Sequence, residues 1–381
     1  MKHCTKCVLP DTRPGLSIGS DGICSACHSH EQENRTNWSL RELEWENLVA
    51  KTKARDAQYD IVLAASGGKD TFHQAMKCLE SGLRVLGVTW RPHCRTELGE
   101  RNLRTLINLG MDHVDFTNNP QVDKLIYKKS FEDLGSDAAM HLSVFSCVAR
   151  FAYLFKVPLV LWSENSATQY GSPDHPLKGS DLTQEWVKVL GSTQGRLAED
   201  YAGEGLSLRD LRGYWFPTDE EMKSKGIRQV FLGYFFRWDA AKHAHVAKSA
   251  GFHGAHRQHD LLTGWDKNSD LDDPFVTAHH RLKMAKFGFS RTQDNLSQKI
   301  RTGEMSRKDA IWHIQQRPDD TNYNALNQLC NFVGEPVDWF YGIEDKFRNR
   351  EIWKQKLDGT WWIPDYVTQI EWFGVGQKRL F

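Results

Sequence analysis

The sequence has no long apolar run, no net charge and no internal repeat. No stretch approaches the roughly 20 apolar residues that cross a bilayer, so a membrane-spanning helix is not expected. Lys and Arg number 49, as do Asp and Glu, so no global positive field attracts nucleic acid. No secretory signal is seen, and the later cysteines are scattered as in reduced proteins. We expect a soluble cytoplasmic protein that binds neither membranes nor nucleic acid.

A serine-glycine-glycine turn behind a short apolar run is the most informative segment. Residues 61–65 read as a buried parallel strand, and residues 70–81 have one apolar helical face. The turn therefore joins a strand end to a helix N-terminus, where backbone N–H groups and the helix dipole attract an anion. Two glycines allow close approach, and Lys69 adds positive charge. A phosphate site is predicted, although the spacing is not G-x-x-x-x-G-K-[ST]; the alternative is a simple connecting turn.

Two C-x-x-C pairs near the N-terminus lie sixteen residues apart. This spacing is typical of a four-thiolate zinc site, and the segment between the pairs is too poor in apolar residues to form a core. Metal binding would supply the missing folding free energy. Two disulfides, four unrelated thiols or one histidine ligand are the alternatives. We predict a structural zinc ion, because four thiolates leave no position for substrate. The predicted ligands are Cys4, Cys7, Cys24 and Cys27.

Strand and helix patterns alternate through the first two thirds of the chain. Further strands are predicted at 84–90, 113–117, 158–162 and 229–236, and helices at 70–81, 96–109, 121–134, 137–155 and 239–250. Such alternation predicts an α/β protein with a parallel, doubly wound sheet and a ligand site at the carboxyl ends of its strands.

The predicted domain organisation has four parts. A zinc knuckle spans 1–35, a charged linker helix 36–57, the α/β domain 58–265 and a helical region 266–381. Periodicity fails over about 166–228, which indicates an inserted lid or partner surface, or partial disorder. The tryptophans of the last stretch are expected to pack a helical region or an interface.

The glycine turn resembles the S-G-G-x-D-[ST] loop of the PP-loop ATP pyrophosphatases, which cleave ATP between its α and β phosphates. The chain also resembles the N-acetyl sugar amidotransferases of bacterial surface-polysaccharide (LPS O-antigen) biosynthesis. The resemblance lies in the knuckle, the glycine turn and segments 89–90, 108–117, 162–166, 232–235 and 286–294. The resemblance extends from the first cysteine to about Ala310. Thr71 replaces the usual serine and keeps the hydroxyl.

This resemblance implies an adenine nucleotide alpha hydrolase-like fold and an amidine-forming reaction. ATP would adenylate the acetamido oxygen of an N-acetyl sugar, expected to be nucleotide-linked, and ammonia would displace AMP after pyrophosphate release. The family implies a separate glutaminase subunit and a barrel-type companion that supply ammonia. This chain shows no evident glutaminase nucleophile, since Cys147 lies in a predicted buried helix.

Roles follow for particular residues. Lys69 and Asp70 would be catalytic, and Asp70 would cap the helix or help to hold Mg²⁺. Glu164 and Asn165 would orient the acetamido group or accept a proton from ammonia; the alternative for Glu164 is an exposed strand-end carboxylate. The turn, the strand-end residues and two helical residues would bind the nucleotide and its phosphates. The alternative for the helical residues, Lys286 and Arg291, is that they lie on a solvated helix face. These nucleotide contacts are Ser66, Gly67, Gly68, Lys69, Asp70, Thr71, Thr89, Trp90, Lys286 and Arg291.

A tRNA-thiolating PP-loop enzyme is the main alternative, because such enzymes also combine a zinc knuckle with this loop. The remaining cysteines form no further C-x-x-C pair, which disfavours it. A histidine group at 243–259 suggests a second metal, but lacks companion ligands and is interpreted as surface histidines.

Overall fold

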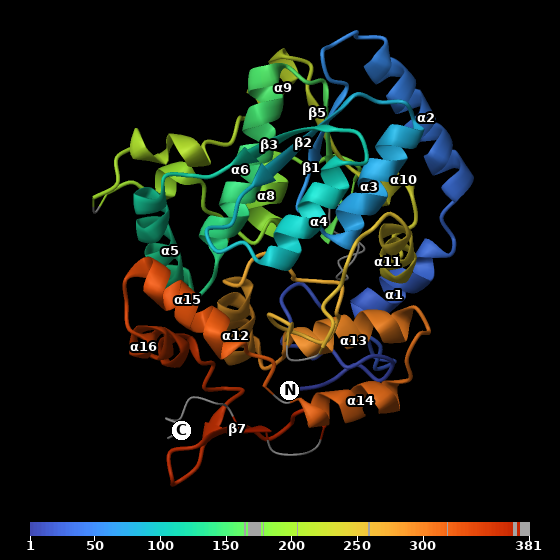
Figure 1. Ribbon diagram of the computed structural model, residues 1–381. Coiled ribbons are helices and arrows are strands. Elements are labelled where there is room, and N and C mark those ends of the chain that lie inside the picture. The colour runs from blue at the N-terminus through green and yellow to red at the C-terminus, as the bar shows by residue number, and fades with distance from the viewer. Residues whose placement is uncertain are drawn as a thin grey trace.

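The computed structural model describes residues 1–163, 165–166, 177, 179–203, 205–257, 260–317, 319–368 and 372–373 (Figure 1). A parallel five-stranded sheet lies at its centre, in the order β3-β2-β1-β4-β5. Ile61 pairs with Val85 on one side and with Leu159 on the other. The strand order reverses between β1 and β4, the point where sheets of this kind bind ligands. The strands are β1 (Ile61–Ala64), β2 (Val85–Trp90), β3 (Asp112–Phe116), β4 (Leu159–Trp162) and β5 (Arg228–Phe231).

Helices cover both faces of the sheet, which confirms the predicted α/β class. Side chains alternate along β1: Ile61 and Leu63 pack with one group of helices, and Val62 packs with the other. The first group is α2 (Trp38–Lys53), α3 (Lys69–Glu80), α4 (Glu97–Ile107), α10 (Leu232–Phe235) and α11 (Ala240–Ser249). The second group contains α5 (Pro120–Leu134) and α6 (Ala138–Phe155).

Helix α6 is long and apolar enough to cross a membrane, and is the one helix of the described residues that passes this test. In the structure 56% of its residues are buried inside the protein. It contacts β1, β2 and β4. Its apolar composition therefore matches its place as a core helix of the sheet.

Two predicted elements were wrong in part. The fifth strand was expected to reach residue 236, but it ends at Phe231, opposite Trp162, where its partner strand also ends. With no further strand to pair with, the chain turns into α10, and Gly233 N donates to Ser163 O at 3.1 Å. The last stretch was expected to be helical, but forms an antiparallel sheet of β6 (Lys354–Gln355), β7 (Trp361–Ile363) and β8 (Trp372–Phe373).

Five helices precede that small sheet, and three of them, α12, α15 and α16, extend the core on the α5 and α6 side. Phe275, Leu282, Leu326 and Phe340 are buried in the same cluster as Val62. Figure 1 shows α12, α15 and α16 below α5. These helices are α12 (Val276–Phe287), α13 (Arg291–Arg301), α14 (Arg307–Gln316), α15 (Tyr323–Val333) and α16 (Val337–Phe347).

The described part of 166–228 also packs on this side of the sheet. Trp186, Tyr201 and Tyr214 are buried in the sheet's own core. This part therefore contributes to the fold, whatever else it binds. Its elements are α8 (Gln184–Leu190), the 3₁₀ turns η1 (Ala198–Tyr201) and η2 (Asp210–Tyr214), and α9 (Asp219–Ser224).

The N-terminal segment, with α1 (Ser25–Glu33), docks on the C-terminal helices. Phe289 is buried among the four cysteines of the knuckle. Arg13 Nε contacts Asp294 Oδ1 at 3.2 Å, and Gln293 Nε2 donates to Val8 O at 3.2 Å. Segments almost 300 residues apart in sequence are thus held together (Figure 1).

Candidate active site and metal centre

The four cysteines of the knuckle form a compact, buried cluster. Their sulfur atoms all lie within 4.8 Å of one another, and Cys7 Sγ is 3.6 Å from Cys24 Sγ. A tetrahedral ion with zinc–sulfur bonds of about 2.3 Å separates sulfurs by roughly 3.8 Å, so the cluster fits zinc. The backbone N–H groups of Cys7 and Cys24 donate to Cys4 Sγ at 3.3 and 3.2 Å, which favours a thiolate there.

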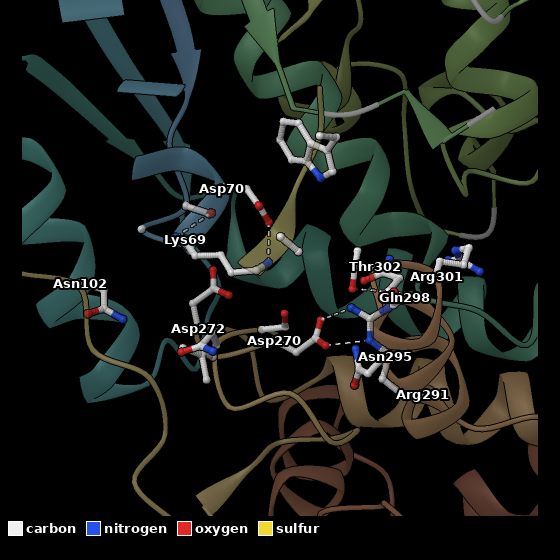
Figure 2. A pocket seen from close by; sticks show the side chains of 18 of the residues that line it. Lys69, Asp70, Asn102, Asp270, Asp272, Arg291, Asn295, Gln298, Arg301 and Thr302 are labelled. Atoms are coloured by element: carbon white, nitrogen blue, oxygen red, sulfur yellow. Dashed lines mark hydrogen bonds and ion pairs between the residues drawn. The ribbon is translucent and has the colours of Figure 1, made fainter. Parts of the chain in front are cut away.

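A cavity of about 260 Å³ lies where the sheet, the knuckle and the C-terminal helices meet (Figure 2). The glycine turn after β1 forms one wall, and α1 contributes His30 and Glu33 to the rim. The opposite wall comes from residues 268–272 and from α13. The cavity is therefore lined by residues of the N-terminal segment, the sheet domain and the C-terminal helices. Its lining also includes Asn102 of α4 and Trp238, which precedes α11.

The glycine turn has the geometry of a helix N-terminus. Gly68 is the N-cap of α3, and its N–H donates to Ser66 Oγ at 3.2 Å. Ser66 Oγ lies 3.1 Å from Thr71 Oγ1, which closes the turn. Gly67 has φ +80°, and a Cβ there would lie 2.7 Å from Leu103 N of α4. Helix α4 therefore fixes the turn from one side, and the N-terminus of α3 faces the cavity on the other, as an anion site requires.

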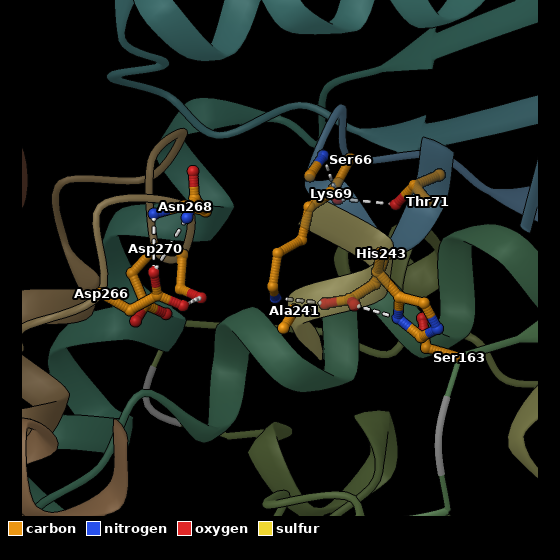
Figure 3. A network of polar contacts seen from close by, with 12 residues as sticks. Ser66, Lys69, Thr71, Ser163, Ala241, His243, Asp266, Asn268 and Asp270 are labelled. Atoms are coloured by element: carbon orange, nitrogen blue, oxygen red, sulfur yellow. Dashed lines mark hydrogen bonds and ion pairs between the residues drawn. The ribbon is translucent and has the colours of Figure 1, made fainter. Parts of the chain in front are cut away.

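Lys69, Asp70 and His243 form a charged network at the turn; Figure 2 labels Lys69 and Asp70, and Figure 3 labels Lys69 and His243. Lys69 Nζ contacts one oxygen of Asp70 at 2.7 Å, and His243 Nδ1 contacts the other at 2.8 Å. Burial favours the neutral acid, but Lys69 and His243 outweigh it and lower the pKa of Asp70 well below its ordinary value. The ring of His73 stacks on His243 at 4.1 Å. His243 is 1% exposed, so its interpretation as a surface histidine was wrong.

The opposite wall carries both cations and carboxylates. Arg291 Nε contacts Asp270 Oδ2 at 2.8 Å (Figure 2). Arg301 Nη1 is buried and has no hydrogen-bond partner among the described residues. Gly99 of α4 approaches Asp272 so closely that a Cβ would lie 2.6 Å from Asp272 Cβ. The guanidinium of Arg301 shares this cavity with the N-terminus of α3, and the two together suit a phosphate group.

Several predicted site residues lie outside the cavity lining. The Oγ1 of Thr89 lies 2.8 Å from His113 Nε2, and Trp90 is buried in the core beside α6. Asn165 Nδ2 donates to Leu177 O at 2.9 Å, and Lys286 Nζ donates to Leu134 O at 2.9 Å. Glu164 lies outside the described residues. Of the predicted nucleotide contacts, the structure brings Ser66 to Asp70 and Arg291 to the cavity.

Other lining residues were not anticipated. Asn102 and Asn295 face the cavity from interior helix positions, and their sequence neighbourhood gives no signal. Asp270 and Asp272 belong to an acidic run that could have been noted, but its place beside the turn depends on the tertiary fold. His243 belongs to the histidine group that was singled out but given no site role.

In a comparison with known proteins, the C-terminal part of the chain matches a described protein family. Residues 262–365 match the family described as LPS biosynthesis protein WbpG-like, C-terminal domain. This C-terminal part of the chain is therefore similar to a domain of lipopolysaccharide-biosynthesis proteins. No curated protein matches it. The solved NMN synthetase from Francisella tularensis is similar over 56% of this chain and 93% of its own, with 15% identity and a TM-score of 0.30.

Proposed function

We propose that this protein is an ATP-dependent amidotransferase of the PP-loop type. It adenylates the acetamido oxygen of an N-acetyl sugar, which we propose is nucleotide-linked, and ammonia then replaces AMP to give an acetamidino sugar. One observation carries the proposal. The glycine turn shares its cavity with residues 268–272 and α13, which belong to the domain matched to lipopolysaccharide-biosynthesis proteins.

The cavity residues suit adenylation. An amide oxygen is a poor leaving group until it carries AMP, so the protein mainly has to align the reactants and stabilise pyrophosphate. Lys69, Arg291 and Arg301 supply positive charge on facing walls. Asp70, Asp270 and Asp272 offer the oxygen ligands that Mg²⁺ prefers, and bound Mg²⁺ would neutralise phosphate charge.

Ammonia is proposed to come from a separate glutaminase subunit with a barrel-type companion. Cys147 is fully buried in α6, and burial raises the pKa of its thiol to about 12, so it is a poor nucleophile. The chain alone should therefore use free ammonium at elevated pH, where NH₃ is populated, but not glutamine. Addition of the two partner subunits should give glutamine-dependent turnover.

The thiolation alternative is disfavoured by the cysteines. No cysteine lines the described wall of the cavity. Cys78 is fully buried, and burial alone raises the pKa of its thiol. Burial also raises the pKa of Cys330 to about 11. A sulfur-transfer enzyme needs an accessible thiolate near its nucleotide.

The test is an assay of purified protein with ATP, Mg²⁺, ammonium and a panel of UDP- and CMP-linked acetamido sugars. Sugar-dependent formation of AMP and pyrophosphate, with an amidine product, is expected. Formation of ADP, or AMP formation that depends on tRNA and a sulfur donor, would contradict the proposal.

A further inference from the structure

A second group of titratable residues lies outside the described cavity, at the N-terminus of α6. The carboxylate of Asp137 is 2% exposed, and its Oδ1 contacts two imidazoles. His141 Nδ1 lies 3.2 Å from this oxygen, and His279 Nδ1 of α12 lies 2.6 Å from it. The two rings are 5.8 Å apart. One buried carboxylate thus makes ion-pair contacts with two imidazoles from different helices.

The contacts leave the other ring nitrogens available. Because Nδ1 of each ring faces Asp137, Nε2 lies on the far side of each ring. The side chains of His141 and His279 are 27% and 22% exposed, so a small solute can reach them. An imidazole whose Nδ1 faces a carboxylate is a common arrangement for a base that acts through Nε2.

This group lies next to the nucleotide cavity. Asp272 lines the cavity wall, and Asp273, the next residue, interacts electrostatically with Asp137 and His141. Consecutive Cα atoms are about 3.8 Å apart. Asp273 Oδ1 also accepts the N–H of Phe275 at 3.0 Å, which fixes the segment that enters α12. The cavity wall and the imidazoles are therefore joined through the short segment that contains Asp272 and Asp273.

We propose that His141 and His279 accept the proton of an ammonium ion that enters the reaction, and that Asp137 is their positioning residue. This inference rests on the proposed amidotransferase function. The ammonium ion gives one N–H proton to a neutral Nε2 and becomes NH₃. Its lone pair then forms the C–N bond to the adenylated carbon, the C–O bond breaks, and AMP leaves with that electron pair. The imidazolium returns its proton to water.

The described geometry favours these histidines over the strand-end residue Asn165. Its amide nitrogen donates to Leu177 O and Gly179 O, and its oxygen accepts from Trp186 Nε1 at 3.0 Å. An amide so engaged, and without a basic atom, is a poor proton acceptor.

Charge around His141 supports a basic imidazole. Burial disfavours its cation, but Asp137 outweighs burial and raises the pKa of His141. Burial also disfavours the Asp137 anion, yet His279 and His141 lower the pKa of Asp137. The other titratable groups that face this carboxylate and these rings are Tyr127, Asp273, His280 and Lys286.

The test compares ammonium with hydroxylamine, which is already unprotonated at neutral pH and needs no base. In the double variant His141→Gln, His279→Gln, the rate of ammonium-dependent amidine formation at neutral pH should fall about a hundredfold. Hydroxylamine-dependent formation of AMP and amidoxime should stay within a few fold. The ratio of the two rates does not depend on the fraction of folded enzyme. A ratio equal to that of the wild type would overturn the proposal.

Two further variants sharpen the result. His280→Gln changes a neighbouring buried histidine whose ring packs against that of His279 and which, among the described contacts, has none with Asp137. It should keep the wild-type ratio, and a hundredfold drop in the ratio would contradict the assignment. Asp137→Asn removes the carboxylate that raises the pKa of His141, so the acid limb of the ammonium rate profile should move to lower pH, and an unchanged profile would refute its positioning role. Absence of AMP formation by the wild type with either nucleophile would instead refute the proposed function on which this inference depends.

Discussion

The two walls of the cavity were built in different ways. One wall, residues 66–70, is continuous in sequence and begins a helix directly after a strand. The other wall is gathered from residues 268–272 and from single positions of α13, and is held in place by a knuckle from the opposite end of the chain. A continuous wall depends on local chemistry, whereas a gathered wall depends on the fold around it. Substitutions in the continuous wall should therefore affect the reaction. Substitutions in the knuckle and in the contacts that support the gathered wall should affect stability as well.

The largest effect is expected from the continuous wall. Lys69→Ala should lower AMP formation about a thousandfold, because it removes the cation nearest the helix end that is proposed to bind phosphate. Thermal unfolding should change little. Lys77→Ala on the same helix is the matched control, since its side chain is partly exposed and pairs with Glu80. Equal rates for the Lys69 and Lys77 variants would remove the distinction between the walls.

The knuckle should give the next largest effect. Cys24→Ser should lower bound zinc from about one per chain and destabilise the protein by several kcal/mol, because the cluster replaces a core. Metal analysis and thermal unfolding measure both changes. Cys94→Ser, outside the cluster, should keep the zinc. Full zinc and full stability in the Cys24 variant would contradict the metal centre.

The contact between knuckle and α13 should be sensitive to acid. Burial favours neutral Asp294, but Lys283 and Arg13 outweigh it and lower its pKa in the folded state. A lowered folded pKa stabilises the protein above the unfolded value of about 3.9, and this contribution is lost as pH falls below it. Asp294→Asn should cost about 3 to 5 kcal/mol at neutral pH, because it leaves buried cations unpaired. Urea unfolding at several pH values should show that this difference shrinks in acid; a constant difference would be inconsistent with the account.

Lys286 should give the smallest effect. Its ammonium donates to Leu134 O and Gly135 O at the end of α5, so Lys286→Met should cost about 1 kcal/mol of stability. The KM for ATP should stay unchanged, while Arg291→Met should raise it. Steady-state kinetics of the two variants compare them directly. An increased KM in the Lys286 variant would return that lysine to the phosphate site.

The difference between the walls also explains what sequence alone could predict. The strand, the glycine turn and the two C-x-x-C pairs were recognisable because short-range spacing fixes their geometry. The contact of His243 with Asp70, and that of Arg13 with Asp294, join distant segments and leave no local pattern. Lys286 resembled a phosphate ligand because a lysine near a helix end has the same sequence signature in both roles. The small C-terminal sheet was missed because its strands are only two or three residues long.

The most direct test of the central proposal follows the oxygen of the substrate. An acetamido sugar with oxygen-18 in the acetyl carbonyl is turned over with ATP and ammonium, and the products are analysed by mass spectrometry. Adenylation of the amide oxygen predicts one oxygen-18 atom in AMP and none in pyrophosphate, together with an amidine that has lost the label. Unlabelled AMP, or oxygen-18 in inorganic phosphate with ADP as the other product, would contradict it.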